Sequence, residues 1–228
     1  MYMEISGIQV EVVRKKIKNM NLYVLPPDGR VRVSVPKFVS DKEISRFILT
    51  KIDWIRKNQK RIENRPCRLE LKFETGELLY IFGKQYFLKV EYRNKHETLI
   101  LEENMVILTV REGRTREQKE KIVNKWYAEM LEKEIRKYVP KWEERTNLYC
   151  EKWQIRNMKS RWGSCNTTKK KICINLQLVH HPIECLEYVI LHELAHLKVN
   201  NHSKRFKDIM DTYMPNWRDT KKLLNGRK

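Results

Sequence analysis

The most constraining feature of this 228-residue chain is a pair of histidines four positions apart, with a glutamate directly after the first. On a helix, residues four apart lie on one face, so His192 and His196 can offer two imidazole nitrogens to one ion. Glu193 lies one step around the helix, within reach of a water on that ion. This spacing is typical of zinc hydrolases and predicts a zinc site with Glu193 as the catalytic carboxylate.

A structural histidine pair in a core is the alternative, because so short a motif also occurs by chance. The surrounding residues favour the metal site. The stretch from Glu184 to Leu197 has the apolar periodicity of a buried helix, and Pro182 suits its first turn. The predicted buried stripe consists of Leu186, Val189, Ile190, Leu194 and Leu197.

His202 is the candidate third ligand, but a helix that continued unbroken from His196 would point His202 away from the ion. Six residues beyond His196 correspond to about 600° of rotation and about 9 Å of rise. We therefore predict that the helix stops at Asn200-Asn201, because asparagine tolerates the left-handed conformation that ends helices. The chain would then double back, and Ser203 would cap the next helix. Three downstream carboxylates are alternative ligands: Asp208, Asp211 and Asp219.

The segment between residues 152 and 183 contains seven Lys or Arg residues and no acidic residue. The patterns of residues 155–159 and 171–175 are typical of strands, and residues 166–168 of a turn between them. We therefore predict a β-hairpin that borders the substrate cleft of the predicted metal site. A positive field there would favour acidic or phosphorylated substrates, although a solvated basic face is the preferred interpretation for the lysines. We predict that Arg161 binds substrate or stabilises a developing oxyanion.

The remaining conspicuous side chains are interpreted as structural. Trp162, Trp217 and Met214 are expected to pack in the core. The five cysteines are odd in number and contain no C-x-x-C pair, so we expect reduced thiols. Cys165 is a weaker candidate nucleophile, because no histidine partner is marked for it. With no signal-like start and no apolar run of ~18 residues, we expect a cytoplasmic protein without membrane contact.

The distribution of periodic segments predicts an α+β fold. Strand patterns occupy residues 8–35 and about 69–110, separated by a helix that opens at Ser40. A long helix is expected over 117–139, with Pro140 kinking it or beginning another segment. We therefore expect a β-rich N-terminal region with one helix at 1–112, followed by a mainly helical catalytic domain at 113–228. Charged residues 111–116 would form the boundary.

Several motifs resemble, in order, those of the YgjP-like metallopeptidases, zincin-like proteins akin to the SprT-like proteases. They are His-Glu-Leu-Ala-His at 192–196, Asn-His-Ser at 201–203 with Phe206, Lys-Ser-Arg-Trp-Gly-Ser-Cys at 159–165, Ile-Asn-Leu-Gln-Leu at 174–178 and Met-Pro-Asn-Trp at 214–217. The resemblance covers most of the chain and weakens toward the N-terminus. It implies a zincin-like catalytic domain with His192, His196 and His202 as zinc ligands and Glu193 as the catalytic carboxylate.

Peptide or protein hydrolysis is the preferred prediction. A metal-dependent nucleotide (phosphoanhydride) hydrolase is the alternative, because the net charge of +19 suits polyanions, although no Gly-rich phosphate loop or acidic Mg²⁺ cluster is visible. A second alternative is a nucleic-acid-associated protease or binding protein held by non-specific electrostatic attraction. No helix-turn-helix, zinc-finger or RNA-binding signature supports sequence-specific recognition.

Overall fold

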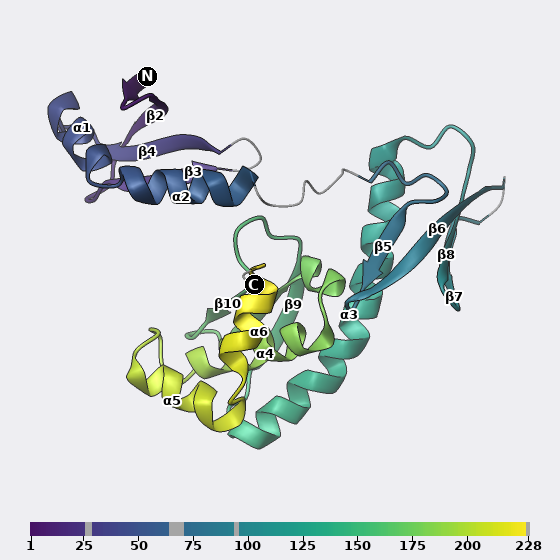
Figure 1. The fold of residues 1–228 in the computed structure, drawn as a ribbon. Helices are drawn as coiled ribbons and strands as arrows, with labels where there is room; N and C mark the ends of the chain where they lie inside the picture. The colour runs from purple at the N-terminus through teal and green to yellow at the C-terminus, as the bar shows by residue number, and fades with distance from the viewer. Residues whose placement is uncertain (26–28, 64–70, 94–95, 227–228) are drawn as a thin grey trace. The chain divides into compact units, whose positions relative to one another are not determined.

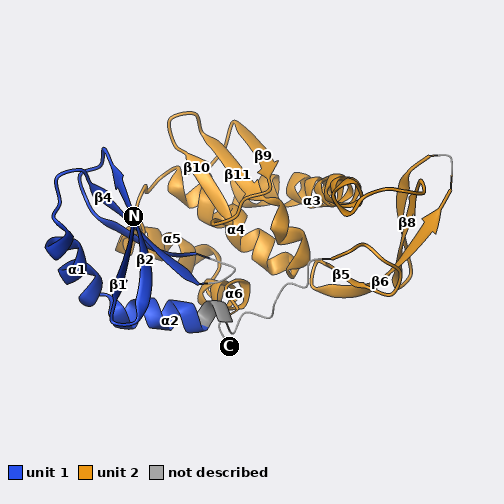
Figure 2. Ribbon diagram, turned by 90° about the horizontal axis from the view of Figure 1, so that it is seen from above, with its two compact units in different colours: residues 1–70 blue, residues 71–228 orange. Residues whose placement is uncertain are grey.

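The computed structural model describes residues 1–25, 29–63, 71–93 and 96–226, with the main chain alone for 61–63. The chain divides into two compact units, residues 1–70 and 71–228 (Figures 1 and 2). Each unit has its own cluster of buried hydrophobic side chains. None of the helices in the described ranges is both long and apolar enough to cross a membrane.

The first unit is a four-stranded sheet with two helices. Its strand order is β1-β2-β4-β3, with β2 and β4 parallel and the other pairs antiparallel. Alternation along β2 buries Ile8, Val10 and Val12, as expected for a sheet with one face in a core. The elements are β1 (Tyr2–Ile5), β2 (Ile8–Lys15), β3 (Asn21–Leu25), β4 (Arg30–Pro36), α1 (Asp41–Leu49) and α2 (Ile52–Glu63).

The helix predicted to open at Ser40 is divided into α1 and α2. Its start is as expected: the Ser40 hydroxyl accepts from the Glu43 N–H at 3.3 Å, and the Glu43 carboxylate accepts from the Ser40 N–H at 2.9 Å. The break follows Leu49, where the Thr50 hydroxyl donates to the Phe47 carbonyl at 2.8 Å. Such local side-chain bonds compete with helix propagation.

The second unit begins with another four-stranded sheet, of order β5-β6-β8-β7. Its inner face packs with the long helix α3 in one core, which includes Leu79, Leu88, Leu108, Val123 and Leu131. The residues on either side of the predicted boundary at 112/113 therefore belong to one compact unit, and the compact units separate at 70/71. The elements are β5 (Leu78–Ile81), β6 (Lys84–Tyr92), β7 (Thr98–Glu102), β8 (Met105–Val110) and α3 (Arg116–Thr146).

Helix α3 confirms the long helix predicted over 117–139 but ends later than predicted, because it continues through Pro140 to Thr146. Proline removes one main-chain donor and usually kinks or ends a helix. Here Tyr138, Val139 and Trp142, on both sides of Pro140, are buried in the core of the second unit. Burial of these large side chains offsets the missing hydrogen bond.

The remaining elements carry the candidate site. A three-stranded sheet has the order β10-β11-β9, and α4 contacts β10, β11, α3, α5 and α6. The sheets lie mainly early in the chain and the helices late, so the α+β prediction is confirmed. The elements are β9 (Lys152–Arg156), β10 (Gly163–Asn166), β11 (Lys171–Asn175), the 3-10 helix η1 (Leu176–His180), α4 (Ile183–His196), α5 (Lys204–Tyr213) and α6 (Trp217–Leu224).

The hairpin in this sheet differs from the predicted one. Its strands are β10 and β11, whereas β9, which overlaps predicted strand 155–159, runs parallel to β11 on the other side. The cause is the buried Asn175 side chain, whose amide donates to the carbonyls of Met158 at 2.8 Å and Arg161 at 2.6 Å. These bonds hold residues 157–162 as a loop between the two outer strands.

Candidate metal centre

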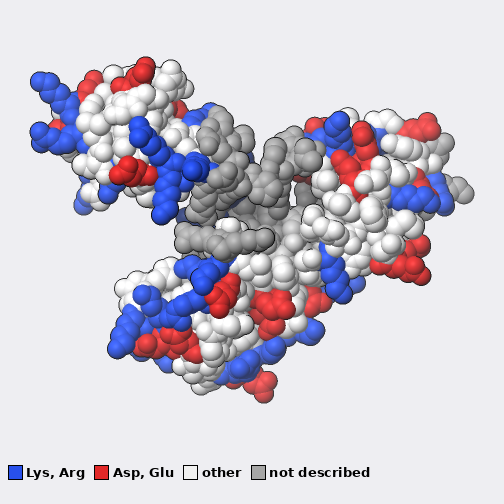
Figure 3. Space-filling view, viewed as in Figure 1, with Lys and Arg blue, Asp and Glu red and all other residues white. Residues whose placement is uncertain are grey.

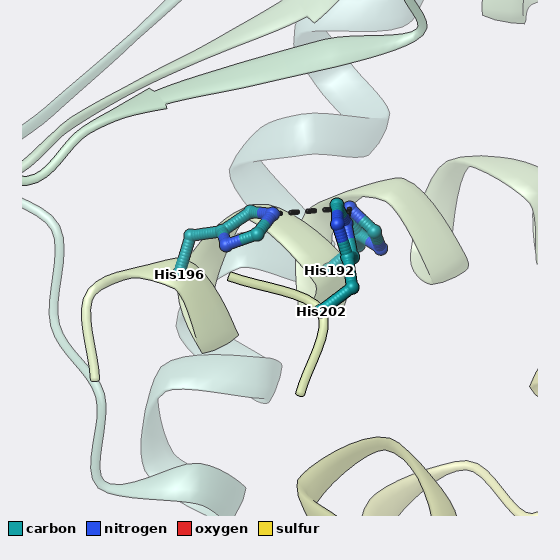
Figure 4. Close-up of side chains that lie close together, drawn as sticks. All are labelled: His192, His196 and His202. Carbon is teal, nitrogen blue, oxygen red and sulfur yellow. Dashed lines mark hydrogen bonds between the residues drawn. The ribbon is translucent and has the colours of Figure 1, made fainter. Parts of the chain in front are cut away.

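Helix α4 supplies the first two histidines. It is buried along most of its length, which fixes the direction of each side chain. His192 and His196 lie one turn apart, and their Nε2 atoms are 3.2 Å from each other. Figure 4 shows these rings and that of His202 pointing toward one another. The predicted pairing of positions 192 and 196 on one face is therefore present in the structure.

His202 reaches the cluster because α4 ends earlier than predicted. The helix stops at His196, four residues before Asn200, and neither Asn200 nor Asn201 has a positive φ. The His196 Nδ1 lies 3.0 Å from the Val199 carbonyl oxygen, a side-chain hydrogen bond that favours a turn over another helical turn. The chain then reverses and brings the His202 Nε2 to 3.1 Å from that of His192.

The segment after His202 follows the predicted course in outline. Ser203 occupies the N-cap position of α5, but its hydroxyl forms no capping hydrogen bond. Its N–H instead donates to the Asn201 side-chain oxygen at 3.3 Å. Phe206, on the first turn of α5, packs against all three histidine rings with centroid separations of 4.8–4.9 Å. The three histidine rings are therefore packed against an apolar side chain, a contact that could not be predicted from the spacing of the histidines.

The three rings present a donor set that fits a divalent cation. Because the Val199 carbonyl can only accept, the bond to His196 Nδ1 puts the proton on Nδ1 and leaves Nε2 as a lone-pair donor. The His192 Nδ1 lies 3.5 Å from the Tyr188 hydroxyl. Zinc–nitrogen bonds of about 2.0–2.1 Å place tetrahedral ligands about 3.4 Å apart, close to the observed separations. The donor chemistry and spacing thus fit zinc.

The electrostatic surroundings favour the neutral form of His192 and of His202. Burial, together with the neighbouring His196 and His202, lowers the pKa of His192 to about 3. Burial and the nearby His196 also lower the pKa of His202. A neutral imidazole is the form that binds a metal. Within the described ranges, His192, His196 and His202 form the one group of three or more potential metal-binding side chains.

The predicted alternative ligands do not enter this group. The Asp211 carboxylate accepts from the Trp217 indole N–H at 2.7 Å and pairs with Arg218. Asp219 pairs with Lys222 at 2.8 Å. Both carboxylates therefore bind partners other than the histidines. Asp208 is likewise not part of the histidine cluster.

Glu193 lies beside the histidines and is 5% exposed. Burial raises the pKa of its carboxyl group to about 8, and the positive charge of Arg161 opposes this rise. A cleft of about 410 Å³ opens in front of these side chains, bordered by β10. Its lining consists of Arg161, Gly163, Ser164, Cys165, Thr167, His192, Glu193, His196, Asn200 and His202.

Cys165 borders the cleft without the properties of a nucleophile. Burial, together with the nearby Glu193 carboxylate, raises the pKa of its thiol to about 11. At neutral pH the unreactive thiol form therefore predominates. Four cysteines are unpaired, namely Cys150, Cys165, Cys173 and Cys185, as expected for reduced thiols. Cys67 lies outside the described residues.

The two tryptophans and Met214 serve in packing, as predicted. Trp217 is buried and stacks on Tyr188, with an interplanar angle of 1° and a centroid separation of 6.3 Å. Trp162 meets the ring of His181 edge-on at 4.9 Å. Met214 is half-buried against the core of the second unit. The stack of Trp217 on Tyr188 supports the helix face that carries His192.

The raised pKa of Glu193 predicts how pH affects the stability of the metal-free protein. Folded Glu193 keeps its proton up to about pH 8, whereas the unfolded carboxyl loses it near 4.5. Between these values the folded state binds more protons, so stability falls as pH rises. Glu193→Gln should lack this contribution, so between pH 5 and pH 8 the parent should lose on the order of 3 kcal/mol of stability relative to the variant.

Urea unfolding in the presence of a chelator at pH 5 and pH 8 measures the effect. The histidines are common to both proteins, so their titration cancels in the difference. Equal pH dependence of the two proteins would contradict a buried Glu193 carboxyl of raised pKa.

A family model described as "YgjP-like, metallopeptidase domain" matches residues 18–227. No curated protein gives a significant match. Among solved structures, the chain is similar to the metallopeptidase zymogen abylysin of Pyrococcus abyssi (17% identity, TM-score 0.38, 41% of this chain and 93% of that chain). It is also similar to the metallopeptidase zymogen jannalysin of Methanocaldococcus jannaschii (26% identity, TM-score 0.35, 38% and 89%). Because the family match spans nearly the whole chain, the protein belongs to the YgjP-like family and carries its metallopeptidase domain.

Proposed function

We propose that this protein is a zinc-dependent hydrolase that cuts peptide bonds. One observation carries the proposal: three histidine Nε2 atoms converge beside the buried carboxylate of Glu193, at the wall of an open cleft. Membership of a family of metallopeptidase domains supports the same chemistry. His192, His196 and His202 would hold the ion, and a catalytic zinc with three protein ligands keeps its fourth position for water or substrate.

A zinc ion in this position would act as a Lewis acid and lower the pKa of water. Glu193 would accept a proton from the attacking water and return it to the leaving amine. The pKa of about 8 applies to the metal-free protein, and a nearby cation favours the ionised form of a carboxyl. Glu193 would therefore be ionised near neutral pH when the site is loaded, as a base must be.

The cleft also has features suited to an extended peptide. β10 lies at the edge of its sheet, with β11 on its inner side, so its outer main-chain groups face away from the sheet. An extended segment can add to such an edge through main-chain hydrogen bonds. Arg161 lines the same cleft and is exposed, so it can bind a substrate carboxylate or stabilise negative charge on the attacked carbonyl.

The two alternative functions gain less support. Arg161 is the one Lys or Arg among the residues that line the cleft, whereas a triphosphate calls for several cations or a bound Mg²⁺. On the face drawn in Figure 3, lysine and arginine side chains of both units stand among aspartates and glutamates. That distribution is typical of a solvated surface. Nucleic-acid binding and a cytoplasmic location stay predictions.

The proposal is tested with the full-length protein loaded with zinc. It is incubated separately with an unfolded protein and with nucleoside triphosphates. We expect new amino termini in the unfolded protein, their loss when a chelator is added, and their return when zinc is restored. Hydrolysis of a triphosphate without cleavage of any peptide bond would contradict the proposal. Retention on DNA that decreases with salt would identify a separate electrostatic attachment.

A further inference from the structure

Gly163 differs from the other glycines of the chain. The sequence contains seven glycines, and six of them have a positive φ, the conformation that disfavours every other residue. Gly163 is the exception, and it lies in β10 with regular pairing to Ile174 of β11. Its main chain could therefore accommodate any residue, so the backbone conformation does not explain why a glycine stands there.

A contact with Glu193 does explain it. A methyl group added at Gly163 would lie 2.5 Å from Glu193 Oε1, 2.8 Å from its Cγ and 2.9 Å from its Cδ. All three separations are shorter than any normal contact between such atoms. The Glu193 side chain therefore lies directly against the bare main chain of β10. The missing side chain at position 163 provides the space that this carboxylate occupies.

Neither main chain can move away easily to relieve such a contact. On the β10 side, the Asn175 N–H donates to the Trp162 carbonyl at 2.9 Å, and the Asn175 amide donates to the Arg161 carbonyl. Ile174, which pairs with Gly163, is fully buried. On the other side, α4 is held in the core by neighbours of Glu193 such as Leu194, which is also fully buried. A side chain at 163 would thus displace the Glu193 carboxylate rather than the two elements.

We propose that Gly163 is a positioning residue that sets the location of the Glu193 carboxylate relative to the three histidines. The catalytic consequence rests on the proposed function, whereas the steric relation between the two residues does not. The proposal also gives a physical reason for the glycine within the Arg-Trp-Gly-Ser motif at 161–164. Removing the space should impair catalysis while leaving the metal ligands in place.

The steric relation is tested by thermal unfolding of zinc-loaded protein, without any activity assay. Four proteins form a cycle: the parent, Gly163→Ala, Glu193→Ala and the double variant. In the parent, Gly163→Ala should lower the midpoint by about 5 °C, as expected for overpacking. In the Glu193→Ala background the three contacting atoms are gone, and the same substitution should raise the midpoint by about 2 °C, because alanine restricts the unfolded chain.

This reversal of sign is the decisive result. A loss of equal size in both backgrounds would overturn the proposal, because it would place the defect in the strand itself. Since no hydrolysis is measured, failure of the proposed function leaves the outcome of the cycle unchanged. Zinc content near one per chain in all four proteins checks that the histidines remain in place.

The catalytic consequence is tested by steady-state kinetics on a peptide substrate. Gly163→Ala should reduce kcat about 10²-fold with little change in KM, because displacing a catalytic group by about 1 Å has effects of this size. In the Glu193→Ala background it should reduce the residual rate no further. An unchanged kcat for Gly163→Ala, or an equal reduction in both backgrounds, would contradict positioning through Glu193.

Discussion

Replacing Glu193 by glutamine is expected to reduce kcat for peptide hydrolysis at least about 10³-fold while the protein keeps its metal. Glutamine has nearly the same shape as glutamate but cannot accept a proton at neutral pH. The Glu193 side chain is buried and lies against Gly163, so an isosteric replacement leaves the packing intact. Measurements of kcat, KM and zinc content on the purified variant separate loss of the base from loss of the metal.

A second glutamate on α4 provides a matched control. Glu187 lies away from the cleft, where its carboxylate accepts from Lys141 at 2.8 Å and from the Trp142 indole at 3.1 Å. Glu187→Gln alters the same helix by the same chemical change and should leave kcat unchanged. If Glu193→Gln retains more than a tenth of the parent activity, Glu193 is not the base.

His202→Ala is expected to weaken zinc binding at least about 10²-fold, since even the outer partners of metal ligands contribute 10-fold to 100-fold. Activity should fall with the loss of zinc and recover partly when zinc is added in excess. His202 tests the ligand set well because it lies in an exposed segment, whereas His192 is held in the buried helix α4. Its removal should therefore affect the fold little. Competition with a zinc-binding dye measures the change in affinity.

His96→Ala serves as the control for His202→Ala. His96 is exposed and lies before β7, outside the lining of the cleft. Its removal should leave both zinc affinity and activity unchanged. If His202→Ala keeps the affinity of the parent, the third ligand lies elsewhere, and Asp208, Asp211 and Asp219 become the next residues to test.

The common face of His192 and His196 could be predicted from the sequence because helix geometry converts a local spacing into a direction. The path to His202 could be predicted only in outline. It required the helix to end, but the place of the end depends on the bond between His196 Nδ1 and the Val199 carbonyl. The asparagines at 200 and 201 suggested a later stop, since residue preference alone does not register such a side-chain contact.

β10 could not be predicted, because Gly163 and Asn166 are residue types that strands disfavour. Its pairing with β11 depends on Asn175, which holds the preceding loop through hydrogen bonds to main-chain groups 14 to 17 residues away in sequence. The continuation of α3 through Pro140 likewise depends on tertiary burial, which outweighs local helix propensity. Long-range contacts of this kind leave no periodic pattern in the sequence.

The hydrogen bond from His196 Nδ1 to the Val199 carbonyl has a consequence for metal uptake. This one contact favours the end of α4 and also selects the tautomer of His196, a candidate ligand. The polypeptide therefore forms this part of the metal site without the ion. A cation that enters the site would bind to the Nε2 lone pair of His196, whose direction is already set by this contact with the main chain. The ring of Phe206 packs against that imidazole. The metal would bind to a site that is already formed in the metal-free protein, and the protein would not need to fold around the metal.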